Sequence, residues 1–394
     1  PRVGYRKRAL DHLADNHLRI QNCIYQSGRD LFNQKLDVVF FDVTTFYFDS
    51  EKEIQGQLRQ KGFSKDGKIG KTQILFGLLI DKDKQPIGYQ LYKGDHFEGH
   101  SFTDALDRLK TRYKIDKIII VADRGMLNTN NLAATKEKGY EFIVGEKLKQ
   151  LPKAIRESLL DLESYQHEWI MKESKDEHIR IRYRTLSHDG RTIIATYSQK
   201  RAKKDAQERE KKLQKAKALL KNPAKLQAKA RRHFITSQSG KPELNQARIK
   251  ESQRYDGILA ISTNAKDLPI DQVLDHYRNL YKIEHSFRSF KSHLETRPMF
   301  HWTDKRIEGH MCLCYIAYAL LSQLQLRLQK KNYPLTEDKL RKLIAKMQLS
   351  HIKNGQREFY LRAKLCDQTR SLLHKIGIKP IPNIFPKGLI AKYL

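Results

Sequence analysis

The stretch VVFFDVTTFYF at residues Val38–Phe48 decides the fold, because it is dense in the β-branched and aromatic residues of a strand buried on both faces. In its middle stands Asp42. A carboxylate there is costly to bury unless it is paired, hydrogen-bonded or bound to a metal ion. The sequence therefore marks Asp42 as a candidate functional residue; a backbone-capping aspartate on a less buried strand is the alternative.

Outward from this strand, the pattern predicts alternating strands and helices. In chain order the predicted elements are strand Gln73–Ile80, strand Pro86–Tyr92, helix Ser101–Tyr113 with Ser101 as its N-cap, strand Lys117–Ala122, helix Asn130–Lys138 and strand Tyr140–Val144. The order β-β-β-α-β-α-β predicts an α/β fold in which helices pack on a mixed sheet.

A second acidic residue, Asp123, directly follows the apolar run KIIIVA at Lys117–Ala122. That position is the carboxyl end of a buried strand, where open α/β sheets place ligand sites. The Arg124-Gly125 pair that follows indicates a turn. An aspartate that caps a helix or a turn is the alternative interpretation.

The composition indicates a folded protein that binds a polyanion. Among 394 residues there are 76 Lys and Arg and 45 Asp and Glu, which gives a net charge of +31. A hydrophobic fraction of 39% is too high for a disordered chain. So much positive charge on a folded chain favours nucleic acid as the partner. The 4 cysteines match no zinc or redox spacing, which favours a reducing compartment.

The start of the chain and its longest apolar run lead to two further expectations. The chain begins at Pro1 without an apolar signal segment, so we expect a fragment or a processed chain. The apolar run near Cys312–Leu321 covers about half a membrane span, which favours a buried helix and no membrane association.

The positive charge is concentrated in one segment. Residues Lys200–Arg254 contain 18 basic and 5 acidic residues, and the Lys/Ala/Leu-rich part of this segment predicts a helix over about Lys200–Ala230. A solvated helical pair is one interpretation of such a charge run. Contact with DNA phosphates is the other. We assign that contact to three lysines of the helix: Lys211, Lys212 and Lys215.

A later helix is predicted over Ile270–Leu294, with Asp267 as a candidate cap and Pro269 at its start. Residues at alternating spacings of three and four form one continuous face: Val273, Tyr277, Leu280, Glu284, Phe287, Lys291 and Leu294. Glu284 and Lys291 then project from the apolar face, where a glutamate needs a partner. An error of phase, in which this face is exposed, is the alternative.

Two acidic residues on core strands and one on a helix suit a pair of divalent ions. Asp42, Asp123 and Glu284 offer hard oxygen donors, which favour Mg²⁺ or Mn²⁺. Two such ions about 4 Å apart activate a water or hydroxyl on one side of a phosphodiester and stabilise the leaving oxygen on the other. The sequence therefore predicts a catalytic two-metal site. We expect the basic surface to bind the DNA on which this site acts.

These motifs resemble those of the DDE transposases of bacterial insertion sequences, which use a ribonuclease-H-like catalytic core. FDVTTFYF with Asp42 and VADRG with Asp123 resemble the first and second aspartate motifs. The order of the predicted elements and the long insertion before the Glu284 helix fit this resemblance. It covers about Leu36–Trp302.

The chain also resembles one branch of these enzymes, which carries a Tyr-x2-Arg-x3-Glu-x6-Lys signature. YRNLYKIEHSFRSFK places Tyr277, Glu284 and Lys291 at that spacing. The position of the signature arginine holds Leu280. Two nearby arginines are the candidates to supply its charge: Arg278 and Arg288.

The resemblance implies a metal-dependent enzyme that cuts insertion-sequence ends and joins the released 3′-hydroxyl to target DNA. The implied partners are double-stranded DNA, as element ends and as target, and a second copy of the chain in the DNA complex. Tyr277 and Lys291 would contact DNA near the cleaved end, Lys291 as a point charge on phosphate. The expected location is the bacterial cytoplasm, associated with the nucleoid. A non-catalytic DNA-binding remnant and a ribonuclease-H-like nuclease without strand transfer are the alternatives.

This interpretation divides the chain into five segments. They are a helical connector at 1–35, expected to follow a missing N-terminal region, the first part of the catalytic core at 36–145, a strand-plus-basic-helix insertion at 146–254, the second part of the core with the Glu284 helix at 255–302, and a helical C-terminal region at 303–394.

Overall fold

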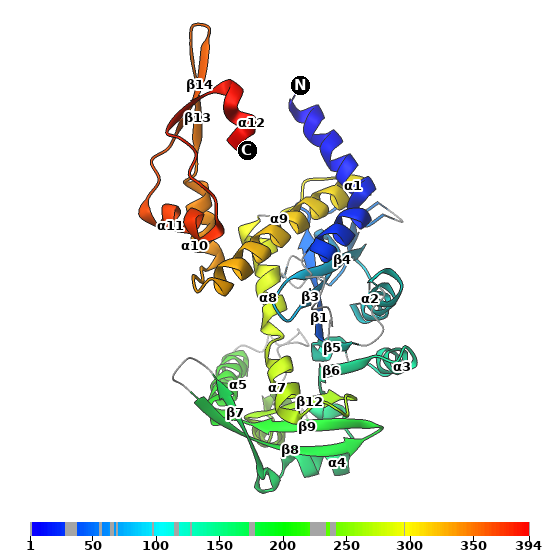
Figure 1. Cartoon of the computed structure of the whole chain (residues 1–394). Helices are drawn as coiled ribbons and strands as arrows, with labels where there is room; N and C mark the ends of the chain where they lie inside the picture. The colour runs from blue at the N-terminus through cyan, green and yellow to red at the C-terminus, as the bar shows by residue number, and fades with distance from the viewer. Residues whose placement is uncertain are drawn as a thin grey trace. The chain divides into compact units, whose positions relative to one another are not determined.

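The computed structural model describes residues 2–27, 38–54, 57–63, 67, 70–96, 98–113, 118–126, 128–172, 178–220, 234–236, 242–294 and 296–393. The chain forms two compact units. The first unit joins Pro1–Lys114 to Tyr281–Leu394, and the second unit is Ile115–Leu280. Figure 1 labels most of the helices and strands of both units.

The first unit is built on an antiparallel sheet. Its strands are β1 (Val38–Tyr47), β2 (Gln60–Lys61), β3 (Thr72–Asp81) and β4 (Pro86–Lys93). β3 pairs with β1, β2 and β4, and Thr44 of β1 lies opposite Phe76 of β3. Both long central strands are buried along almost their whole length, as their β-branched and aromatic residues predict.

The helices of this unit are α1 (Arg2–Ser27), α2 (Glu98–Tyr113), α8 (Tyr281–Arg288) with the π-helical turn Ser289–His293, α9 (Asp304–Lys330), α10 (Glu337–Ala345), α11 (Asp367–Ile376) and α12 (Ile390–Tyr393). Aromatic rings fix two of them on the sheet. Phe41 packs against Phe102 of α2, with ring centroids 6.0 Å apart. Phe76 packs against Phe287 of α8 at 6.4 Å and against Phe290 of the π-helical turn at 4.9 Å.

α1 and α9 pack against each other in the same unit. Gly309 of α9 makes this possible, because a side chain there would overlap the backbone carbonyl of Leu10. Among the described residues, α9 is long and apolar enough to cross a membrane by length and composition, and part of its surface is buried inside this unit. The predicted buried helix at Cys312–Leu321 lies within it.

A buried arginine, Arg59, packs against aromatic rings next to the end of β1 in this unit. The guanidinium carbon of Arg59 lies 4.7 Å from the ring centroid of Phe48 and 4.2 Å from that of Trp302. The same guanidinium donates to the Ser50 hydroxyl at 3.0 Å and to the Lys52 carbonyl at 2.9 Å. Arg59 is 1% exposed, and its burial lowers its pKa.

The C-terminal region contains helices, as predicted, and also a small sheet that the sequence analysis did not predict. Its strands are β13 (Leu349–Asn354), β14 (Arg357–Arg362) and β15 (Ile384–Pro386), all antiparallel. α9, α10 and α11 share a separate apolar cluster, formed by Leu328, Leu340, Leu343 and Leu372.

The second unit contains a mixed sheet in the order β5-β6-β12-β9-β8-β7. Its strands are β5 (Ile119–Ala122), β6 (Glu141–Gly145), β7 (His167–Lys172), β8 (His178–His188), β9 (Arg191–Tyr197) and β12 (Ile258–Thr263). β5 and β6 are parallel, and the other pairs are antiparallel. Its helices are α3 (Thr129–Glu137), α4 (Lys153–Leu160), α5 (Gln199–Leu220), α6 (Gln246–Gln253) and α7 (Ile270–Arg278).

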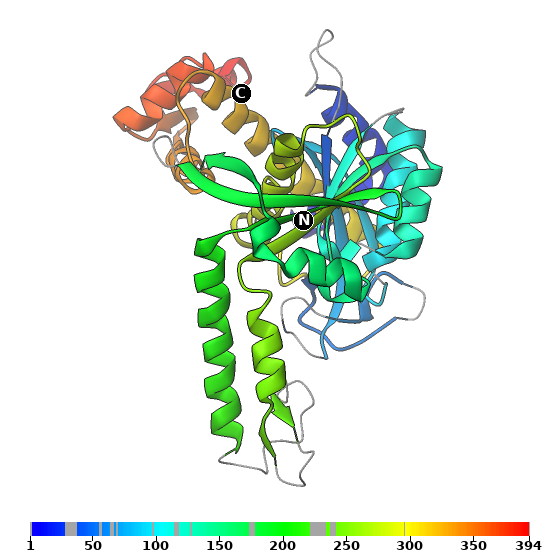
Figure 2. The same cartoon turned by 90° about the horizontal axis from the view of Figure 1, so that it is seen from below.

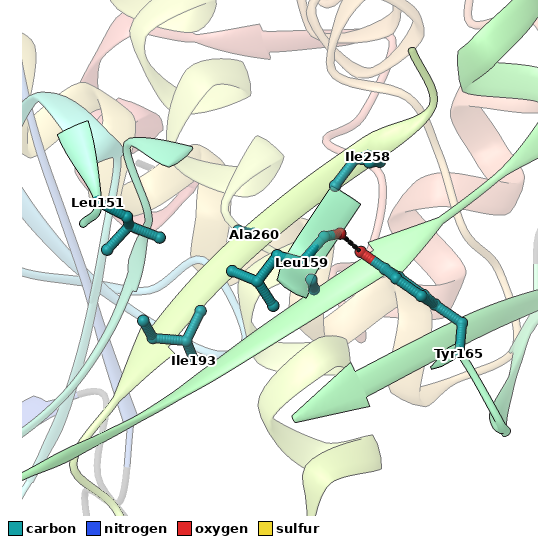
Figure 3. Packing of buried hydrophobic residues seen from close by; sticks show 7 residues of the cluster. Leu151, Leu159, Tyr165, Ile193, Ile258 and Ala260 are labelled. Carbon is teal, nitrogen blue, oxygen red and sulfur yellow. Dashed lines mark hydrogen bonds between the residues drawn. The ribbon is translucent and has the colours of Figure 1, made fainter. Parts of the chain in front are cut away.

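Figure 3 shows the core beneath β9 and β12. Leu151, Leu159, Ile193 and Ala260 pack together there, and the Tyr165 hydroxyl donates to the Leu159 carbonyl at 2.7 Å. Figure 2 shows α5 and α6 extending from this unit as a pair of helices. A second apolar cluster joins the two helices: Ala216, Phe234, Ile235 and Ile249. The short strands β10 (Ile235–Thr236) and β11 (Glu243–Leu244) pair with each other and lie at the end of the two helices in Figure 2.

The predicted order of strands and helices through β6 is confirmed apart from the short strand β2, which was not predicted, and three local predictions are wrong. α2 begins at Glu98, so Ser101 lies inside the helix and is not its N-cap. The N-cap of α7 is Pro269 and not Asp267. The predicted helix Ile270–Leu294 is three pieces, because α7 ends at Arg278, α8 begins at Tyr281 and a π-helical turn follows. The chain passes from the second unit to the first at this break. α5 ends at Leu220, and the part of its predicted helix beyond that residue lies outside the described residues.

Candidate active site

Asp42 lies on the α8 side of β1. Side chains alternate along a strand, so Asp42 shares a face with Thr44 and Phe46. Thr44 lies opposite Phe76, whose ring packs on Phe287 of α8. Asp42 is half-buried on a strand whose neighbours are almost all buried, and its Oδ1 accepts the Val43 backbone N–H at 2.7 Å. This hydrogen bond restricts the rotation of the carboxylate.

Glu284 lies at the edge of the buried stripe of α8. The helix buries Ile283, Ser286 and Phe287, and α8 packs on β1. Glu284 follows Ile283 by one residue, which turns it about 100° away from that side chain. It is exposed, so its predicted inward orientation is wrong, whereas Phe287 of the same predicted face is buried, so the alternative that the whole face is exposed is not correct either. The physical reason is the break at the start of α8, which sets a new phase for this helix.

Lys291 lies on the same side of the sheet as Asp42. It belongs to the π-helical turn after α8, is half-buried, and its ammonium lies 5.9 Å from the centroid of the Phe46 ring. An ammonium at this distance from a ring face gains a modest cation–π attraction. The first unit therefore brings Asp42, Glu284 and Lys291 to β1 and to the helical segment that covers it.

Asp123 lies in the second unit, directly after β5, as the sequence predicts. The residue is exposed, and its Oδ1 accepts the backbone N–H of Arg124 at 2.7 Å. A 3₁₀ turn, Arg124–Met126, follows it. β5 runs parallel to β6, so the carboxyl ends of both strands lie at one edge of this sheet.

Tyr277 of α7 lies at that edge. A side chain at Gly145, the last residue of β6, would overlap the Tyr277 hydroxyl oxygen and would lie 3.0 Å from Arg124 Cβ. Tyr277, Gly145 and Arg124 are therefore neighbours, next to the turn that carries Asp123. Gly145 is not among the residues predicted from the sequence, and Arg124 was predicted only as part of a turn. A glycine at the end of a buried strand is the signal that indicates such a close approach.

A cleft of about 580 Å³ extends from this edge of the second unit toward α5. Arg124, Gly145 and Tyr277 line one end of it, and Arg209 and Lys212 of α5 line another part. Of the three lysines predicted to bind DNA, Lys212 lines the cleft, and all three are exposed: Lys211, Lys212 and Lys215. This exposure is compatible with both interpretations of the basic segment.

The two candidates for the charge of the missing signature arginine differ in position. Arg278 is half-buried in the last turn of α7, in the second unit, and Arg288 is exposed in the last turn of α8, in the first. Leu280 lies in the break between these helices. Neither arginine occupies the helix position that the signature assigns to its arginine.

The donor chemistry of the three acidic residues suits a hard divalent ion, because each offers carboxylate oxygens and no softer ligand. Asp42 and Asp123 each have one oxygen bonded to the next backbone N–H. Within the described residues, no three His, Cys, Asp or Glu side chains gather as a ready metal-binding group. Asp42 and Glu284 belong to the first unit, and Asp123 belongs to the second.

Comparison with known proteins identifies the family. The family model described as Transposase DDE domain matches residues 33–320. No curated protein matches the chain. A solved structure, the cryo-EM structure of the piggyBac transposase synaptic complex with hairpin DNA, is similar at 8% sequence identity and a TM-score of 0.41. The similarity covers 79% of this chain and 52% of that chain, so the chain spans about half the length of that transposase.

The matched segment begins before β1 and ends within α9, so it contains Asp42, Asp123 and Glu284. The predicted α/β fold with a mixed sheet and a helical C-terminal region is confirmed. Because the family model covers most of its length, this protein belongs to the Transposase DDE domain family.

Proposed function

We propose that this DDE transposase cuts the ends of a bacterial insertion sequence and joins the released 3′-hydroxyl to target DNA, with Asp42, Asp123 and Glu284 as ligands of two Mg²⁺ or Mn²⁺ ions. The observation that supports this most directly is the packing of α8 on β1. It puts the Asp42 face of the sheet under the helix that carries Glu284. A half-buried carboxylate on an otherwise buried strand is costly unless a cation or hydrogen bonds stabilise it.

The bound metal ions would activate a water or hydroxyl for attack on the phosphodiester and would stabilise the leaving oxygen. The chain's own residues orient the reactants. The backbone N–H groups of Val43 and Arg124 hold the carboxylates of Asp42 and Asp123. Lys291, half-buried beside Phe46, supplies a fixed positive charge for a phosphate on the same side of β1.

DNA binding belongs to the proposal as well. We assign phosphate contacts to exposed lysines of α5 and contacts near the cleaved end to groups close to the acidic residues: Tyr277, Arg278, Arg288 and Lys291. A homodimer would pair the two ends of the element. Because the proposed substrate is DNA of the bacterial nucleoid, the proposed location of the enzyme is the cytoplasm. The five-segment division of the chain also stays a proposal.

The test compares three neutral variants, Asp42→Asn, Asp123→Asn and Glu284→Gln, on a duplex that carries an element end. We expect each to lose cleavage in Mg²⁺ while duplex affinity is retained, because each removes a ligand charge and little volume. Asp275→Asn is the matched control, since Asp275 is an exposed aspartate on α7. Full cleavage by any of the three would refute its role as a ligand.

The same assay separates the alternatives. Strand cutting without joining of the 3′ end to a second duplex would indicate a nuclease without strand transfer. DNA binding by the wild-type chain with no cutting in Mg²⁺ or Mn²⁺ would indicate a non-catalytic remnant. Titration calorimetry with Mn²⁺ adds a readout that is independent of activity. We expect its binding heat to be lost in Asp42→Asn.

A further inference from the structure

The first unit contains a second cleft, of about 590 Å³, whose lining is rich in cations. The turn between β3 and β4, the outer face of α8 and parts of α9 and α10 form its walls. We call it the basic cleft, and its basic lining residues are Lys82, Lys84, Lys282, His285, Arg288 and His293. Of these, only Arg288 is a candidate DNA-binding residue predicted from the sequence.

Lys84 is held in the cleft by an unusual backbone conformation. Its φ is +63°, in the left-handed region, where a residue with a Cβ is less stable than glycine. Asp81 fixes the turn by accepting the backbone N–H groups of Asp83 and Gln85, each at 2.8 Å. The Tyr318 hydroxyl donates to the Lys84 carbonyl at 3.0 Å. The turn therefore has a lysine at a position where the backbone of glycine or asparagine would be less strained.

Lys282 connects α8 to the same turn. Its Nζ donates to the Lys82 carbonyl at 2.6 Å, which leaves other N–H groups of the ammonium for a ligand. Tyr281, which is 45% exposed, lies beside this turn, with its ring centroid 6.0 Å from Lys84 Nζ. Arg288 is exposed further along the helix. The lysines and Arg288 therefore come from the β3–β4 turn and from α8, and a hydrogen bond between Lys282 and Lys82 connects these two elements.

Three carboxylates face the four Lys and Arg side chains of the lining, so they compensate part of this charge and leave a positive excess. Glu337 lies 2.9 Å from His293 and also accepts the Ser289 hydroxyl. Asp338 pairs with Lys342 at 2.8 Å. Asp83 is the remaining carboxylate of the lining, and it is exposed. Burial lowers the pKa of Lys84, and the negative charge of Glu337 offsets only part of this effect, so the ammonium is poorly solvated and gains from a further anion.

We propose that the basic cleft binds backbone phosphates of duplex DNA, as a contact surface additional to α5 and to the acidic residues. This inference rests on the proposed function for its DNA substrate. Phosphates repeat along a strand, so cations that a turn and a helix bring to one cleft can neutralise more than one of them. The lining comes from four separate elements and includes no glycine-rich loop of the kind that holds a free nucleotide.

The test uses Lys84→Asn combined with Lys82→Gln. Asparagine tolerates the left-handed conformation better than lysine, so the variant loses charge without loss of the turn. We expect its thermal midpoint to equal or exceed that of the wild type. Loss of two phosphate contacts lowers the slope of log K against log salt by about 1.8, which corresponds to about 60-fold weaker binding at about 0.1 M salt. Fluorescence anisotropy with a labelled duplex of random sequence measures the affinity and its salt dependence.

A variant with the same charge change elsewhere, Lys364→Gln with Lys379→Gln, is the control, because both lysines are exposed in the C-terminal region. An unchanged slope and affinity in the cleft variant, or an equal loss in this control, would overturn the inference. So would mononucleotide binding that the variant loses while its duplex affinity stays intact. If the wild-type chain binds no duplex at all, the proposed function fails first. If it binds and the cleft variant binds equally, only the basic cleft is refuted.

Discussion

Gly145→Ala tests the arrangement around the Asp123 turn. Gly145 ends β6, and an added Cβ would overlap the Tyr277 hydroxyl oxygen. The same Cβ would lie 3.0 Å from Arg124 Cβ and 3.3 Å from the Arg124 backbone nitrogen. Insertion of one methyl group into a packed site costs about 1–3 kcal/mol. We expect a loss of that size in the free energy of unfolding of the second unit, because both Arg124 contacts involve atoms near the backbone.

A double-mutant cycle measures the share of this cost that comes from Tyr277. Tyr277→Phe removes the overlapping oxygen, so the cost of Gly145→Ala should fall by about 1 kcal/mol or more when the two substitutions are combined. Urea unfolding measures the four free energies. Gly125→Ala is the control, because a Cβ at Gly125 meets nothing within 4 Å and a neutral change is expected. An undiminished cost in the Tyr277→Phe background would refute the close approach of Tyr277 to β6.

Three further predictions concern the DNA surface and the core. Reversal of charge at Lys211, Lys212 and Lys215 to Glu should weaken binding to all duplex sequences alike and flatten the salt dependence; an unchanged slope in a salt titration would leave α5 as a solvated surface. Phe290→Ala should cost about 3–5 kcal/mol in urea unfolding, because the ring is fully buried against Phe76 and Tyr318; a loss below about 1 kcal/mol would contradict this packing. Burial and nearby His301 lower the pKa of His310 to about 4, so stability should fall as the pH drops from about 6.5 to about 4, by on the order of 3 kcal/mol; His310→Gln should lose this part of the pH dependence.

The strands that carry or precede the acidic residues could be predicted because each is a run of consecutive apolar residues, which is typical of a buried strand. β1 and β3 are nearly continuous runs of β-branched and aromatic side chains, and β5 is a short apolar run that ends at Asp123. Local patterns do not state which distant segments meet, so the association of Asp42, Asp123 and Glu284 in one site stays a prediction, based on their donor chemistry and on the family resemblance.

The break between α7 and α8 could not be predicted from the same kind of pattern. Apolar residues continue at helical spacing through Leu280, and no glycine or proline interrupts them. The helix ends because its two halves pack in different units, which is a tertiary effect. The C-terminal sheet is a different case. Asn354-Gly355 joins β13 to β14, and this dipeptide between alternating residues is a strong hairpin signal that the sequence analysis did not use.

The stacking of Arg59 on Trp302 has a practical consequence for spectroscopy. The chain has 2 tryptophans, and each unit holds one. Trp169 of β7 is 6% exposed, whereas Trp302 is 53% exposed and has a cation against its ring. The two indoles should therefore emit at different wavelengths, and replacing either by Phe leaves a chain whose fluorescence follows one half of the molecule. Unfolding and DNA titrations can then be recorded for each half without an added dye.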